Sequence, residues 1–105
     1  DAGWMYNWQA EHPCPGQTDI PWVPMIWGGD DIWKASSLKG GDYDALLGFN
    51  EPNAGNQANL SPQDACDKWW AFEQSGLRLG SPSATQWGAF DWTKEWLDCI
   101  NNKGY

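Results

Sequence analysis

Short apolar runs alternate with polar or helix-like segments along the 105 residues of the chain. The apolar runs predict strands over 2–8, 21–27, 44–50 and 77–82. The intervening segments predict a short helix over 31–38, a longer one after Ser61, and a last one over 91–101. Pro24 cannot donate a hydrogen bond to a neighbouring strand, so we expect an irregular point there.

The helix after Ser61 has the clearest boundary signals. Ser61 can cap the first turn, Pro62 fits the first helical position, and Asp64 suits the positive end of the helix. Gly76 is a typical stop signal, because glycine readily adopts the left-handed conformation that ends a helix. The sequence therefore predicts a helix between Ser61 and Gly76.

The alternation of strands and helices predicts an α/β fold built from parallel βα units. We expect one domain, 1–105, which is too short for a complete (β/α)8 barrel of roughly 250 residues. A partial barrel leaves one face of its sheet uncovered, whereas parallel sheets are normally buried on both faces. An open, flavodoxin-like sheet with helices on both faces is therefore the alternative.

Side chains that can bind or react cluster where the predicted strands end. In parallel α/β folds, functional residues lie at the carboxyl ends of the strands. The carboxyl of Glu51 can protonate a leaving oxygen, and the amide of Asn50 can hydrogen-bond a hydroxyl group. Because Glu51 precedes Pro52, we expect an extended backbone at Glu51. The three strand ends with such residues are Tyr6-Asn7-Trp8, Met25-Ile26-Trp27 and Phe49-Asn50-Glu51.

Composition narrows the kinds of ligand. A net charge of −8 disfavours nucleic acid, and no apolar run is long enough to span a membrane. Ten tryptophans suit either a large aromatic core or a groove that stacks on sugar rings.

The cysteines form no metal-binding pattern with His12, the one histidine. Since there are three of them, at least one is free or pairs outside the chain. Cys66 and Cys99 both fall on predicted outer helices, either as buried apolar residues or as a disulfide.

Several motifs resemble glycoside hydrolase family 128, the glycosyl hydrolase catalytic core of endo-β-1,3-glucanases found largely in fungi. The most specific is LLGFNEPN at 46–53, followed by QANLSP at 57–62. The remaining motifs are WMYNW at 4–8, WVPMIWG at 22–28, LGSP at 79–82 and WLDC at 96–99. Together they are similar to the central part of the family's barrel.

The resemblance implies strands two to five of a (β/α)8 barrel in a retaining enzyme without metal or cofactor. Glu51 is then the acid/base, Asn50 its hydrogen-bonding neighbour, and the nucleophile lies on the seventh strand, outside this chain. The ligand is a β-1,3-glucan or oligosaccharide, and the location is secreted or in the cell wall. The implied substrate-binding residues are Tyr6, Asn7, Trp8, Trp27 and Asn53. The tryptophans interpreted as packing residues are Trp4, Trp22, Trp69, Trp70, Trp92 and Trp96.

The missing nucleophile leaves other functions open. Glu11, Asp30 and Asp31 are the nearest alternatives for a second carboxylate, although ordinary surface charge explains them better. A second chain or a homodimer can complete the barrel, but a homodimer places two Glu51 residues four strands apart, whereas the family's pair lies three apart. The alternative function is a non-catalytic β-glucan-binding or effector protein.

Overall fold

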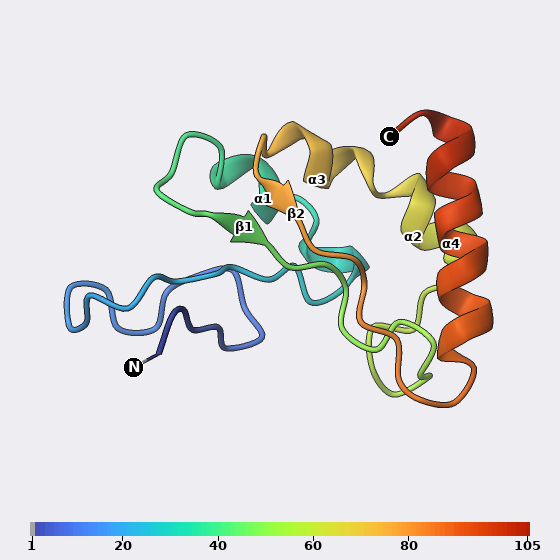
Figure 1. Ribbon diagram of the computed structural model, residues 1–105, viewed down its shortest axis with the longest axis horizontal. Coiled ribbons are helices and arrows are strands. Elements are labelled where there is room, and N and C mark those ends of the chain that lie inside the picture. The colour runs from blue at the N-terminus through green and yellow to red at the C-terminus, as the bar shows by residue number, and fades with distance from the viewer. Residues whose placement is uncertain (1) are drawn as a thin grey trace.

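The computed structural model describes residues 2–105 (Figure 1). Its elements, in chain order, are η1 (Gly29–Asp31), α1 (Lys34–Ser37), β1 (Ala45–Leu46), α2 (Pro62–Asp67), α3 (Trp70–Gln74), β2 (Arg78–Leu79) and α4 (Ala89–Lys103). Within the described range, no helix has the length and apolar character needed to cross a membrane.

Four extended segments run parallel and neighbour one another in chain order, although the regular strands are short. β1 and β2 pair through Ala45 with Arg78 and Leu46 with Leu79. Isolated parallel bridges join Met5 to Trp22, Met25 to Leu47, and Asn50 to Ser83. The parallel βα arrangement predicted from the sequence is therefore present.

Two of the predicted strands are less regular than expected. The segment 21–27 forms only isolated bridges, and Pro24 lies between them. The prediction of a strand through Trp8 is wrong, because Met5 alone forms a bridge and Trp8 has a φ of 46°. A left-handed residue turns the chain, so the extended segment cannot continue there.

The predicted helices are confirmed, with adjusted boundaries. The Ser61 hydroxyl accepts a hydrogen bond from Asp64 N at 3.0 Å, and Pro62 is the first residue of α2. Gly76, with a φ of 70°, follows the end of α3. The expected single helix is divided at Lys68 and Trp69 into α2 and α3, and α4 extends beyond the predicted 91–101 at both ends.

The helices pack on one face of the extended segments. Figure 1 shows α1 next to β1, α3 above β2, and α2 and α4 to the right of both strands. Ile26, Leu46 and Phe49 of the extended segments share one hydrophobic cluster with buried residues from all four helices. This one-sided layer agrees with part of a barrel, whereas an open sheet requires helices on both faces.

A disulfide between Cys66 of α2 and Cys99 of α4 links two helices of this layer, while Cys14 is free. The bond joins residues 33 apart, so it restricts the unfolded chain considerably. We expect the double substitution Cys66→Ala and Cys99→Ala to lower the free energy of unfolding by roughly 3 kcal/mol, measured by urea denaturation.

The substitution Cys14→Ala is the matched control, and it should leave the urea midpoint of the oxidised protein almost unchanged. Equal midpoints for the reduced and the oxidised wild type would contradict a stabilising bond.

Candidate functional site

Glu51 lies where the segment after β1 ends, but its backbone is not extended as expected. Its φ is 40°, in the left-handed region. Glu51 N donates to Ser83 O at 2.9 Å, and Ala54 N donates to Glu51 O at 3.0 Å. These bonds to two different segments outweigh the preference that Pro52 imposes on the residue before it.

The loop after Glu51 closes on itself. Ala58 N donates to Asn50 O at 3.2 Å, and Leu60 N donates to Pro52 O at 2.8 Å. A left-handed residue other than glycine costs roughly 1–3 kcal/mol, and such residues gather at functional sites. The loop therefore holds the half-buried Glu51 in a conformation that the residue would not adopt by itself.

The side chain of Asn50 is oriented by Gln57. Asn50 Nδ2 donates to Gln57 Oε1 at 2.9 Å, and Asn50 N donates to Trp27 O at 3.0 Å. One amide hydrogen and the amide oxygen of Asn50 have no partner among residues 2–105 and can contact a ligand. The sequence contained Gln57 within a motif, but it gave no signal that Gln57 would orient Asn50.

A hollow of about 410 Å³ adjoins Asn50. Leu47 and Gly48 line it, whereas their chain neighbours Leu46 and Phe49 belong to the helix-side core. The hollow therefore lies on the sheet face that none of the described helices covers. Its lining residues are Trp4, Tyr6, Met25, Leu47, Gly48, Asn50, Gly80, Ser81, Pro82 and Ser83.

Three aromatic side chains of the N-terminal segment form a row. The ring centroids of Trp4 and Tyr6 are 6.1 Å apart, and those of Tyr6 and Trp8 are 4.9 Å apart. All three are exposed, and Trp4 and Tyr6 line the hollow. The row thus places Trp4 and Tyr6 in the hollow that Asn50 also lines, and Trp8 continues the row next to Tyr6.

The prediction of packing tryptophans is correct in part. Trp22, Trp69, Trp92 and Trp96 are buried, but Trp4 and Trp70 are 55% and 47% exposed. Trp4 faces the uncovered hollow rather than the helix layer, and Trp70 lies on the outer surface of α3.

The other predicted binding residues lie in different surroundings. Asn7 is exposed, and Trp27 is half-buried. Asn53 Nδ2 donates to Thr85 O at 3.1 Å and to Trp87 O at 2.7 Å, and Asn53 Oδ1 accepts from Thr85 N at 2.8 Å. Both amide hydrogens of Asn53 are thus already used within the protein.

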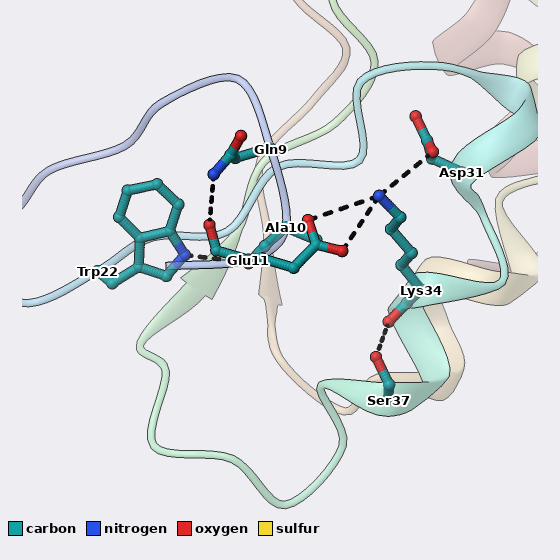
Figure 2. A network of polar contacts seen from close by, with 7 residues as sticks. All are labelled: Gln9, Ala10, Glu11, Trp22, Asp31, Lys34 and Ser37. Atoms are coloured by element: carbon teal, nitrogen blue, oxygen red, sulfur yellow. Dashed lines mark hydrogen bonds and ion pairs between the residues drawn. The ribbon is translucent and has the colours of Figure 1, made fainter. Parts of the chain in front are cut away.

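Two of the three alternative carboxylates are paired with Lys34, as Figure 2 shows. Lys34 Nζ lies 3.1 Å from Glu11 and 3.5 Å from Asp31. Backbone hydrogen bonding, followed by the contact with Lys34, lowers the pKa of Glu11 below its ordinary value. In residues 2–105, no group of three or more His, Cys, Asp or Glu side chains is placed to hold a metal ion.

Residues 1–104 match the family model described as the glycosyl hydrolase catalytic core. The chain belongs to this family. Its match covers the Asn50–Glu51 strand end, the hollow and the helix layer. No curated protein sequence is significantly similar to the chain.

Solved structures of glycoside hydrolase family 128 match nearly the whole chain. A subgroup I endo-β-1,3-glucanase from Amycolatopsis mediterranei, in complex with laminaritriose, is 32% identical with a TM-score of 0.76. The match covers 99% of this chain and 45% of that one. The chain therefore spans less than half the length of this relative.

Members of two other subgroups match similarly. A subgroup II endo-β-1,3-glucanase from Sorangium cellulosum has a TM-score of 0.81 at 29% identity, covering 94% of this chain and 47% of that one. A subgroup III curdlan-specific exo-β-1,3-glucanase from Blastomyces gilchristii has a TM-score of 0.75 at 31% identity, covering 96% and 47%.

Proposed function

We propose that the chain is the acid/base-bearing part of a retaining β-1,3-glucan hydrolase, corresponding to strands two to five of its barrel. The observation that carries this proposal is Glu51, held in a left-handed conformation at a strand end beside an open, aromatic-lined hollow. The relatives named above are β-1,3-glucanases, and two of them are solved with laminaritriose or glucose.

Glu51 has the role of proton donor in this proposal. Its carboxyl protonates the glycosidic oxygen as the bond from that oxygen to the anomeric carbon breaks. A carboxylate about 5–5.5 Å away attacks the anomeric carbon and forms the glycosyl-enzyme, which water then hydrolyses with Glu51 as the base. This nucleophile comes from a polypeptide segment beyond these 105 residues, either of the same protein or of a second chain.

The remaining site residues bind the sugar. Asn50, oriented by Gln57, donates to a hydroxyl group beside the scissile bond. Tyr6, Trp8 and Trp27 stack on glucose rings, because aromatic faces cover the apolar C–H face of a sugar well. Asn7, which is exposed and stands between Tyr6 and Trp8 in the chain, hydrogen-bonds a hydroxyl group of the glucan.

Binding of laminarihexaose, measured by isothermal titration calorimetry, tests this site without requiring turnover. We expect Tyr6→Ala to weaken binding roughly five- to tenfold, because it removes one stacking partner. Tyr105→Ala is the matched control, since Tyr105 is similarly exposed but lies beyond the end of α4. Equal affinities for the wild type and the Tyr6→Ala variant would exclude Tyr6 from the site.

A non-catalytic glucan-binding protein is the second candidate. The observation that favours it is the pairing of Glu11 and Asp31 with Lys34, which engages two of the alternative carboxylates. This candidate predicts laminarihexaose binding without release of reducing sugar, even when the rest of a barrel is supplied. A secreted or cell-wall location suits either candidate, and the Cys66–Cys99 disulfide supports it because such bonds persist in oxidising compartments.

A further inference from the structure

We infer that Trp87 is an additional sugar-stacking residue of this site, and that Asn53 is the positioning residue that holds it there. The inference rests on the proposed function, because it assigns a further glucan contact to the same site. Neither residue has this role in the sequence-based prediction, which omitted Trp87 and gave Asn53 a direct contact with sugar.

The segment that leads to Trp87 is joined to the Glu51 segment by three hydrogen bonds. Ser83 O accepts from Glu51 N at 2.9 Å, and Ser83 N donates to Phe49 O at 2.9 Å. Two residues further along, Thr85 N donates to Asn53 Oδ1 at 2.8 Å. The segment 83–87 thus follows the loop after Glu51 (residues 51–60, the acid/base loop), and Figure 1 shows the two loops side by side near the lower end of α4.

The side-chain amide of Asn53 also binds the backbone of Trp87 directly. Asn53 Nδ2 donates to Trp87 O at 2.7 Å and to Thr85 O at 3.1 Å. Asparagine can donate two hydrogens from this group, and both are used here. A sugar hydroxyl that accepted from Asn53 Nδ2 would have to displace one of these bonds, so a positioning role fits the geometry better.

The side chain of Trp87 is unusually open for a tryptophan on a fixed backbone. It is 81% exposed, the highest value among the large hydrophobic side chains of the described residues. Exposing an indole to water is unfavourable. The backbone around Trp87 is nevertheless restricted, because the side chain of Asn53 makes three hydrogen bonds to Thr85 and Trp87. An exposed aromatic face whose backbone is bonded to Asn53, two positions after Glu51, is suited to a ligand with a flat apolar surface, because the backbone loses little further freedom upon binding.

The ligand that this face fits is a glucan rather than a protein. Relatives in the family are solved with laminaritriose, laminarihexaose or glucose, and the hollow beside Asn50 already offers a polar and aromatic lining. Phe90, on the first turn of α4, is almost as exposed, but no side-chain hydrogen bond ties its backbone to the acid/base loop. The contacts of Asn53 therefore single out Trp87.

Titration of the full chain with laminarihexaose tests the inference. We expect Trp87→Ala to weaken binding roughly five- to tenfold. Trp70→Ala is the matched control, because Trp70 is exposed on the outer surface of α3, and it should leave the affinity unchanged. In ¹⁵N-labelled protein, the indole resonance that Trp87→Ala removes should shift upon addition of laminarihexaose.

A double-mutant cycle then distinguishes positioning from direct contact. If Asn53 acts through Trp87, Asn53→Ala weakens binding severalfold alone but adds nothing when Trp87 is already alanine. In the Asn53→Ala variant alone, the Trp87 indole resonance should also move before any sugar is added. Independent losses that multiply in the double variant would overturn the positioning role and restore the direct sugar contact.

The remaining outcomes separate the inference from the proposed function. Wild-type binding that is insensitive to both Trp87→Ala and Asn53→Ala overturns the inference and leaves the proposed function standing. A wild type that does not bind laminarihexaose overturns both. A Trp87→Ala variant that loses affinity together with its folded circular dichroism spectrum does not count as binding evidence, and the indole shift of the wild type then decides.

Discussion

Replacing Glu51 with glutamine is expected to lower laminarin hydrolysis by about 10²–10⁴-fold, the usual contribution of a general acid/base. The measurement is release of reducing sugar by the chain combined with the polypeptide that completes the barrel. Glutamine keeps the size and hydrogen-bonding reach of the side chain but cannot donate the required proton. Laminarihexaose affinity should therefore stay close to that of the wild type, which separates loss of chemistry from loss of binding.

The left-handed backbone of Glu51 provides a second, independent measurement. Glu51→Gly should remove activity as well, but it should raise the free energy of unfolding by about 1 kcal/mol, because glycine adopts this conformation without strain. If Glu51→Gly gains stability and loses hydrolysis, the strained backbone of Glu51 lowers stability in exchange for activity. Hydrolysis that is unaffected by Glu51→Gln would show that another carboxyl donates the proton.

Gly48→Ala is expected to destabilise the fold strongly, by roughly 4 kcal/mol in the free energy of unfolding. A Cβ atom at Gly48 would lie 2.8 Å from Pro82 N and 2.9 Å from Gly80 O. Both atoms are backbone, so no side chain can rotate away to make room. Relief requires the segments that follow β1 and β2 to move apart, which would break the bridge between Asn50 and Ser83.

Gly28→Ala is the matched control for this prediction. Gly28 is also buried at the end of an extended segment, but a Cβ added there meets no atom within 4 Å. Urea denaturation of the two variants should give a large loss of stability for Gly48→Ala and a small change for Gly28→Ala. Similar midpoints for both would show that the two segments separate at little cost.

Local signals in the sequence predicted the elements of the fold well. The Ser61 cap, the position of Pro62 and the stop at Gly76 are decided by hydrogen bonds within one turn, and all three are present in the structure. The order of the parallel segments follows from the alternation of strands and helices. The irregular segment around Pro24 also follows from the chemistry of one residue.

Features decided by contacts between distant segments were less predictable. The backbone of Glu51 depends on Ser83, 32 positions along the chain (83 − 51), and no local rule contains that contact. The exposure of Trp4 follows from the absence of a helix over the sheet face beneath it, whereas Trp92 and Trp96 of α4 face the core. The sequence left the pairing of Cys66 with Cys99 open, because pairing depends on how α2 lies against α4.

The loop that follows Glu51 also affects how a complete active site would be assembled. Glu51 is held by Ser83 and Ala54, and the loop behind it closes through Asn50, Pro52, Ala58 and Leu60, all within this chain. Its backbone geometry is therefore set before any further strand arrives. The distance between the two carboxyl groups, which decides whether a glycosidase retains or inverts the anomeric configuration, would then be determined by the segment that brings the nucleophile. Changes in that segment would alter the stereochemistry of the product while leaving Glu51, the proposed proton donor, where it is.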